Sequence, residues 1–181
     1  MPMRLKQQYK QEVIPKLKEQ FGHTNTHEIP TFQKVTVNIG LGKGVQDAKY
    51  LETAERTLRR ITGQKPIKTL ARKSISNFKI REGNVVGMVV TLRGAKMWDF
   101  LEKLIRVSLP RTRDFRGLSP TSFDGQGNYS IGFREHIAFP EIRSDEVEAI
   151  HGVQVTIGMN ARRREEAHAL LKTIGFPLKE T

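Results

Sequence analysis

The sequence predicts an α+β protein in which helices cover one face of an antiparallel sheet and leave the other face open. Three segments alternate apolar and polar residues with the two-residue period of a β-strand. The apparent helices each carry a single apolar stripe, so each can cover only one face of a sheet. After a first helix the elements follow the order strand, helix, strand, strand, helix, strand, which is the split βαβ arrangement.

The first helix is expected over residues 5–21, where apolar residues recur at every fourth position. Pro15 lies inside it and is expected to kink or divide it. The first strand is expected in "KVTVNIGL", whose apolar residues all face one way. Asp47 is a plausible N-cap for the second helix, and Gly63 is its expected end.

The rest of the chain continues the pattern and contains two long basic or polar interruptions. The expected elements are a short strand from about Lys65 to Leu70, a strand in "VVGMVVTLRG", a helix from about Ala95 to before Pro110, strands in "YSIGF" and "VQVTIGMNA", and a last helix capped by Gly175. Extended loops are expected at about 71–84 and 111–128. No linker divides the chain, so residues 1–181 are expected to form one domain.

The second face of the predicted sheet is polar. Its members, read from the strand alternation, are chiefly Lys34, Asn38, Thr91 and Arg93. An α+β sheet with an open polar face, as in the RRM-like order, is a common platform for RNA. At the level of fold this is an analogy and does not establish a function.

The charge balance favours a polyanionic partner. The chain holds 31 Lys and Arg against 19 Asp and Glu, a net charge of +12. The absence of cysteine excludes disulfides and thiolate metal sites. No apolar run approaches the ~20 residues of a membrane span, and no signal peptide is expected. The basic runs lack a helical pattern, so nucleic acid is a better candidate than a membrane surface.

Two segments concentrate cations in irregular sequence. The first, from Gln64 to Gly83, carries six cations before its first carboxylate: Lys65, Lys68, Arg72, Lys73, Lys79 and Arg81. Hydroxyls, an amide and Phe78 are interspersed, and such groups bond phosphates and sugars or stack on bases. The second, "PRTRDFRG", likewise combines several cations, here three arginines, with one aromatic residue. Arginine suits phosphates and carboxylates alike, so its partner is RNA or an acidic protein.

Motifs that could carry other chemistry fail on spacing. "GLGKG", Gly40 to Gly44, lacks the spacing of a phosphate loop, although Lys43 could still hold an RNA phosphate. His23 and His27 have the spacing of a helical metal pair, but "TNT" between them is a poor helix segment. No metal or cofactor is therefore expected.

The sequence offers little for catalysis. Asp114, Asp124 and Glu141 are acid–base candidates, but none has a catalytic partner at a spacing that the sequence can identify. We therefore expect no enzyme. An RNA-processing enzyme and a general single-strand binder remain the alternatives. The first requires a metal or acid–base cluster, and the second requires several stacking aromatics.

Six motifs in order resemble a known family. They are "ITGQKP", "ARKSISNFKIREG", "VTLRGAKMW", "LPRTRDFRGLS", "SFDGQGNYSIG" and "FPEI". The chain resembles, over roughly residues 3–178, the bacterial form of the L5 family of large-subunit ribosomal proteins. The resemblance implies a non-enzymatic protein that binds 5S rRNA in the central protuberance.

The resemblance also implies roles for particular positions. The open face would contact 5S rRNA through Asn38, Gln64, Thr91 and Arg93. Together with the cations beside them, the expected rRNA-binding set is Lys34, Asn38, Gln64, Lys65, Thr91 and Arg93. The loop expected to contact P-site tRNA holds Arg72, Lys73, Ser74, Ser76, Asn77, Phe78, Lys79 and Arg81. The segment expected in an intersubunit bridge to a small-subunit head protein holds Arg111, Arg113, Asp114, Phe115 and Arg116.

Further expected partners are the large-subunit rRNA and other central-protuberance proteins, in a bacterial cytoplasm or a plastid stroma. Two positions depart from the family pattern. Relatives often carry lysine where Val89 stands, so the RNA face should make about one phosphate contact fewer. The slope of log affinity against log salt concentration should then be smaller by about 0.7 to 0.9. "TIGMNARRREE" also departs, so no contacts are implied for residues 158–164.

Overall fold

The computed structural model of the chain describes residues 4–42, 47–143 and 150–179. In these ranges the strands are β1 (Phe32–Gly40), β2 (Ile67–Leu70), β3 (Val85–Leu92), β4 (Tyr129–Phe133) and β5 (Val153–Met159). The helices are α1 (Leu5–Gln8), α2 (Ile14–Phe21), α3 (Ala48–Thr62), α4 (Gly94–Lys103) and α5 (Arg164–Ile174). None of the helices described is long and apolar enough to cross a membrane.

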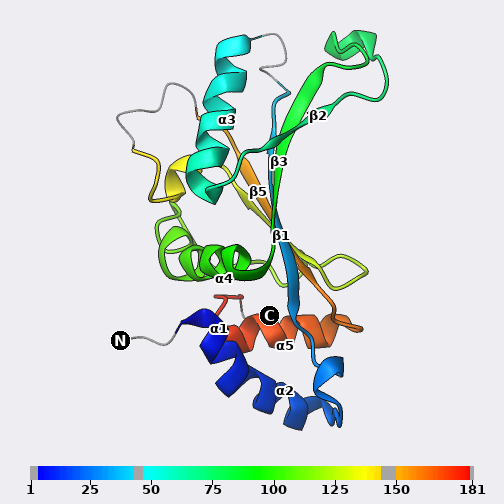
Figure 1. The fold of residues 1–181 in the computed structure, drawn as a ribbon, viewed down its shortest axis with the longest axis vertical. Coiled ribbons are helices and arrows are strands. Elements are labelled where there is room, and N and C mark those ends of the chain that lie inside the picture. Colours follow the sequence, from blue (N-terminus) through cyan, green and yellow to red (C-terminus); the bar gives the residue numbers. More distant parts are fainter. Residues whose placement is uncertain (1–3, 43–46, 144–149, 180–181) are drawn as a thin grey trace. The chain divides into compact units, whose positions relative to one another are not determined.

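The sheet confirms the predicted fold class. Its strands lie in the order β2-β3-β1-β5-β4 (Figure 1) and form an open antiparallel sheet. Without β4, the order β2-β3-β1-β5 is that of the split βαβ arrangement. β4 adds a further strand beside β5, so β2 and β4 are the two edges.

The chain folds into two compact units, and strands of the sheet contribute residues to both. Unit 1 comprises Met1–Val35, Leu92–Ile131 and Thr156–Thr181. Unit 2 comprises Thr36–Thr91 and Gly132–Val155. The single-domain organisation stays a prediction.

The strand alternation predicts the core correctly. Of the inward-facing apolar residues of the three predicted strands, all but the half-buried Val86 are buried: Val35, Val37, Ile39, Leu41, Met88, Val90, Leu92, Val153, Val155, Ile157 and Met159. In unit 2, the buried stripe of α3 contributes Ala54, Leu58 and Ile61. The alternate positions of the strands are therefore left for the other face.

Pro15 changes the first helix as predicted, and the structure shows how. A π-helical turn, Tyr9–Val13, separates α1 from α2, and the N–H of Ile14 bonds to the carbonyl of Tyr9. The same arrangement precedes Pro110, where the N–H of Leu109 bonds to the carbonyl of Leu104 after a π turn at Leu104–Ser108. Proline cannot donate the next helical hydrogen bond, so the ladder widens just before it.

The caps of α3 are also as predicted. The Asp47 carboxylate accepts from the N–H groups of Lys49 at 2.9 Å and Tyr50 at 3.4 Å. Gly63 ends the helix with φ +63°, a conformation that glycine adopts without a Cβ penalty. This end directs Gln64 and Lys65 out of the helix toward β2.

A stacked histidine pair lies in unit 2. The rings of His136 and His151 are 4.0 Å apart between centroids and inclined by 4°. The backbone N–H of His151 donates to the ring Nδ1 of His136 at 3.3 Å. Burial first, and the charge of the neighbouring His136 second, lower the pKa of His151 to about 4. Burial also lowers the pKa of His136.

We expect this pair to make the free energy of unfolding fall on acidification. The unfolded chain takes up protons near pH 6.5 while the folded pair stays neutral, so stability is lost between about pH 6.5 and pH 4. The loss from His151 should reach about 3 kcal/mol. Urea unfolding across this pH range measures it. His151→Phe should flatten the dependence, and an unchanged slope would contradict this origin.

Candidate RNA-binding interface

The polar face in unit 2 carries four of the predicted rRNA-binding residues. Asn38 and Gln64 are half-buried, whereas Lys65 and Thr91 are exposed. The β2–β3 register pairs Ile67 with Val89. Lys65, two residues before Ile67, and Thr91, two residues after Val89, therefore lie at the same end of this strand pair.

Gln64 and Lys65 are held where α3 ends. The hydroxyl of Thr62 donates to the carbonyl of Leu58 at 2.6 Å and accepts from the N–H of Gln64 at 3.3 Å. These bonds satisfy backbone groups that a helix end leaves without partners. The chain thus leaves α3 in a fixed direction, with the Lys65 side chain in solvent.

The polar face in unit 1 carries the other two predicted residues, Lys34 and Arg93, both exposed. The stem of Lys34 lies along Gly158 of β5, since a Cβ on Gly158 would sit 2.9 Å from its Cγ and 3.3 Å from its Cε. A larger residue at position 158 would displace this lysine. On the neighbouring strands, the hydroxyls of Ser130 and Thr156 lie 3.1 Å apart and form a hydrogen bond.

The segment between β2 and β3 is an ordered basic hairpin, residues 71–84, which protrudes beyond its strands (Figure 1). Ile75 and Ile80 exchange backbone hydrogen bonds of 2.9 and 3.1 Å, and the Ser74 hydroxyl accepts from the N–H of Glu82 at 2.9 Å. All eight predicted tRNA-contacting residues are exposed on it: Arg72, Lys73, Ser74, Ser76, Asn77, Phe78, Lys79 and Arg81. At the tip, the Phe78 side chain is 71% exposed.

One of the six cations between Gln64 and Gly83, Lys68, has an acidic partner. Lys68 lies on the other side of β2, and its ammonium group is 3.7 Å from the Glu55 carboxylate on α3. The segment itself holds no carboxylate before Glu82, and the partner of Lys68 comes from another element, α3. The alternation within β2 explains it, because neighbours along a strand point to opposite faces.

The arginine turn, residues 111–116, belongs to unit 1. Arg111, Arg113, Asp114 and Arg116 are exposed and Phe115 is half-buried. The turn is fixed at its start by the Thr112 hydroxyl, which donates to the carbonyl of Ser108 at 3.1 Å. At its end, Gly117 has φ +92°, and a Cβ there would make a tight contact of 3.0 Å with Lys179 Cγ. Asp114 has φ +54°, so it serves as a turn residue.

Asp124 also organises a loop. Its carboxylate accepts from the N–H of Gln126 at 2.9 Å, the N–H of Asn128 at 2.8 Å and the side-chain amide of Asn128 at 2.7 Å. The side-chain Oδ1 of Asn128 in turn accepts from the N–H of Met159 at 3.2 Å. The "SFDGQGN" motif thus fastens its loop to the end of β5.

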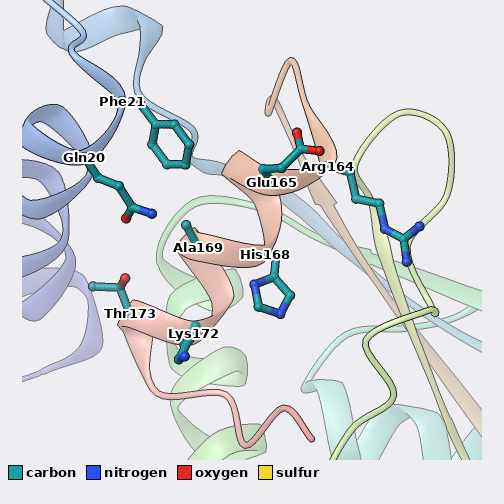
Figure 2. A pocket seen from close by; sticks show the side chains of 8 residues that line it. All are labelled: Gln20, Phe21, Arg164, Glu165, His168, Ala169, Lys172 and Thr173. Atoms are coloured by element: carbon teal, nitrogen blue, oxygen red, sulfur yellow. The ribbon is translucent and has the colours of Figure 1, made fainter. Parts of the chain in front are cut away.

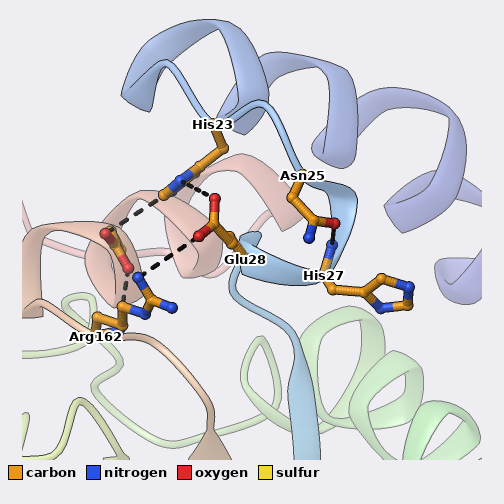
Figure 3. A network of polar contacts seen from close by, with 6 residues as sticks. His23, Asn25, His27, Glu28 and Arg162 are labelled. Atoms are coloured by element: carbon orange, nitrogen blue, oxygen red, sulfur yellow. Dashed lines mark hydrogen bonds and ion pairs between the residues drawn. The ribbon is translucent and has the colours of Figure 1, made fainter.

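The two histidines weighed as a metal pair point apart. His23 lies 3.9 Å from Glu28 and 3.8 Å from the buried Glu166, while Arg162 lies 3.7 Å from Glu28 (Figure 3). His27 projects to the other side of the turn, where Asn25 accepts from its backbone N–H. This network joins the segment before β1 to the start of α5. The phosphate contact considered for Lys43 lies outside the described residues.

A groove of about 470 Å³ lies between α2 and α5 in unit 1 (Figure 2). Its lining mixes the apolar Phe21 and Ala169 with Arg164, His168 and Lys172 from α5. Arg164 is engaged at its edge, donating to the carbonyl of Pro120 at 2.8 Å. Glu165 of α5 also lines the groove, so its charges are mixed in sign.

An open sheet face with polar and cationic side chains, together with a basic hairpin, defines an α+β RNA-binding protein. Residues 25–81 match the family model "Ribosomal protein L5", and residues 85–178 match "ribosomal L5P family C-terminus". The chain belongs to the ribosomal protein L5 family.

Curated relatives agree over the whole chain. "Large ribosomal subunit protein uL5" of Microcystis aeruginosa is 52% identical across 99% of this chain and 100% of the relative. The proteins of the same name from Synechocystis and Rubrobacter xylanophilus are each 53% identical, across 99% and 97% of this chain and 99% and 98% of the relatives. The protein is a structural constituent of the large ribosomal subunit, with ribosomal RNA as a partner, and is not an enzyme. In bacteria such as these relatives, the large subunit works in the cytoplasm.

The sequence missed two residues of the polar face, Thr69 and Gly87. β2 is too short for the alternation of its side chains to show which face each residue occupies. Its register with β3 cannot be predicted from the sequence of either strand alone. Gly87 did carry a signal, because a glycine inside a strand often marks a close backbone approach.

Proposed function

We propose that the protein anchors 5S rRNA in the central protuberance through the open face of its sheet. The contacts are those of Lys34, Asn38, Gln64, Lys65, Thr91 and Arg93. The observation that carries the proposal is the exposure of four of these residues on the face opposite the buried apolar residues of the sheet. Lys34 and Thr91 lie on strands, and Lys65 and Arg93 lie just beyond the ends of β2 and β3. Cations there neutralise phosphates, and amides and hydroxyls bond sugars and base edges.

Contacts to RNA shape and backbone, rather than stacking, dominate in this proposal. The aromatic residues of the strands, Phe32, Tyr129 and Phe133, are buried in the core. None of the six proposed contact residues is aromatic, so bases have no ring to stack on.

The basic hairpin has a separate role, contact with P-site tRNA. Its backbone bonds preorganise four exposed cations and the exposed Phe78, so little entropy is lost when they bind. The arginine turn contacts a protein of the small-subunit head in an intersubunit bridge. Other central-protuberance proteins and the large-subunit rRNA complete the surroundings.

Lysine footprinting tests this division of surfaces. With 5S rRNA bound, Lys34 and Lys65 should acetylate severalfold more slowly, because their ammonium groups contact phosphates. Lys73 and Lys79 of the hairpin should react as in the free protein. Lys6 and Lys10, exposed on the first helix, are the internal controls. Equal protection of hairpin and sheet lysines would contradict the proposed division.

A further inference from the structure

On the polar face of unit 2, the hydroxyl of Thr69 covers Gly87, which has no side chain of its own. The β2–β3 register pairs Thr69 with Gly87, so their side-chain positions share a face. A Cβ on Gly87 would lie 2.8 Å from Thr69 Oγ1 and 3.9 Å from Asn38 Oδ1. The Thr69 hydroxyl therefore leans over the bare glycine, and the Asn38 amide borders the same spot from β1.

Both polar groups are free to bind a ligand. Within the described ranges 4–42, 47–143 and 150–179, neither the Thr69 hydroxyl nor the Asn38 amide has a side-chain hydrogen bond. Each is half-buried, so it is partly shielded from water without an internal partner. Polar groups in this state gain most from a bonding ligand.

An apolar pair lies next to this spot. Ile67 pairs with Val89 on the same face, and the Ile67 side chain is 70% exposed. Among the open-face residues of this patch, Ile67, Thr69, Asn38, Gly87 and Val89, none is charged. The nearest cation along β2 on this face is Lys65, two residues before Ile67, so a phosphate is held at the edge of the patch and not over it. A ribose suits the uncharged patch better, since it presents an apolar ring edge and a 2′-hydroxyl that both donates and accepts.

We propose that Thr69 and Asn38 bind a ribose 2′-hydroxyl of 5S rRNA above Gly87, with Ile67 and Val89 as an apolar shelf under the sugar. The inference rests on the proposed function of the open face. It adds Thr69 and Ile67 to the interface. It also gives Val89 a role, since a lysine there would replace part of the shelf with a charge.

The test is a 5S rRNA titration of Thr69→Val at several salt concentrations. Valine keeps the shape and removes the hydroxyl, so affinity should fall about threefold to tenfold, the worth of one hydrogen bond. The salt slope should not change, because no cation is lost. Thr69→Ser should restore most of the affinity. Val89→Lys provides the contrast, since its slope should steepen by about 0.7 to 0.9.

A scan of 5S rRNA with single 2′-deoxy substitutions identifies the sugar. At one nucleotide the substitution should weaken wild-type binding as much as Thr69→Val does, and should not weaken the variant further. Thr24→Val, in an exposed loop of unit 1, is the matched control. Unchanged affinity of Thr69→Val, or no coupled nucleotide, would overturn the inference while a 5S rRNA preference of the wild type would still stand. Loss of that preference itself would instead overturn the proposed function.

Discussion

Replacing Asn38, Thr91 and Arg93 with alanine should weaken 5S rRNA binding by about three-hundredfold to four-thousandfold. Two neutral hydrogen-bonding groups contribute about 1 kcal/mol each, and a charged one contributes about 1.5 to 3 kcal/mol. Every 1.4 kcal/mol is about tenfold in affinity. Because only Arg93 is charged, the salt slope should fall by about 0.7 to 0.9. Filter binding at several salt concentrations measures both quantities.

The matched control removes the same kinds of group from another surface. Gln7, Lys10 and Gln11 are exposed on the first helix, and their replacement by alanine also removes two amide or hydroxyl groups and one cation. This variant should bind 5S rRNA within about twofold of wild type. The control variant should unfold like wild type, because exposed substitutions usually change stability by no more than about 0.5 kcal/mol. Asn38 is half-buried, so urea unfolding of the test variant checks that its fold is retained. Equal losses in the two variants would show general charge attraction and not a defined face.

Removing the hairpin cations should weaken tRNA binding on the ribosome and spare 5S rRNA binding. The variant carries Arg72→Gln, Lys73→Gln, Lys79→Asn and Arg81→Gln. Asparagine is chosen at position 79 because the backbone there has φ +52°. Ribosomes carrying it should hold P-site tRNA about tenfold less tightly, about 1.4 kcal/mol spread over the lost phosphate contacts. Affinity for 5S rRNA should stay within about threefold at physiological salt, where separated charges are screened.

A control of equal charge replaces Lys6, Lys10, Lys16 and Lys18 with glutamine on the exposed side of the first helices. It should leave tRNA retention unchanged. A hairpin variant that lost 5S rRNA affinity as strongly as tRNA affinity would contradict separate roles for the sheet face and the hairpin.

The parts of the fold that sequence predicted depend on local rules. Strand alternation placed Val37 and Ile39 in the core because a strand turns successive side chains to opposite faces. Asp47 and Gly63 delimit α3 because a helix end must satisfy its own backbone groups. Pro15 interrupts the regular α-helix for an equally local reason, because proline has no backbone N–H to donate.

The parts that sequence could not predict depend on partners far along the chain. Lys68 pairs with Glu55 only once α3 lies against β2. His136 and His151 stack across a 15-residue separation. The hairpin looked irregular because its order comes from backbone bonds such as Ile75 to Ile80, which no side-chain pattern encodes.

The candidate interface shows the same division. Lys34 and Thr91 could be assigned to the open face from their parity in the strands, and both are exposed. Thr69 could not, since its position over Gly87 follows from register alone. The acid–base candidates Asp114 and Asp124 proved to be turn-forming residues, because short acidic side chains suit positive φ and cap loop N–H groups.

The most direct measurement of the central claim is a titration of the purified protein against 5S rRNA and a length-matched control RNA. It should be made at about 0.15 M salt, where unspecific attraction is screened. The account predicts a preference of about a thousandfold for 5S rRNA, at the lower end for specific nucleic-acid binders. Equal affinity for both RNAs, with the same steep salt dependence, would contradict it and would leave a basic protein that coats RNA without selecting it.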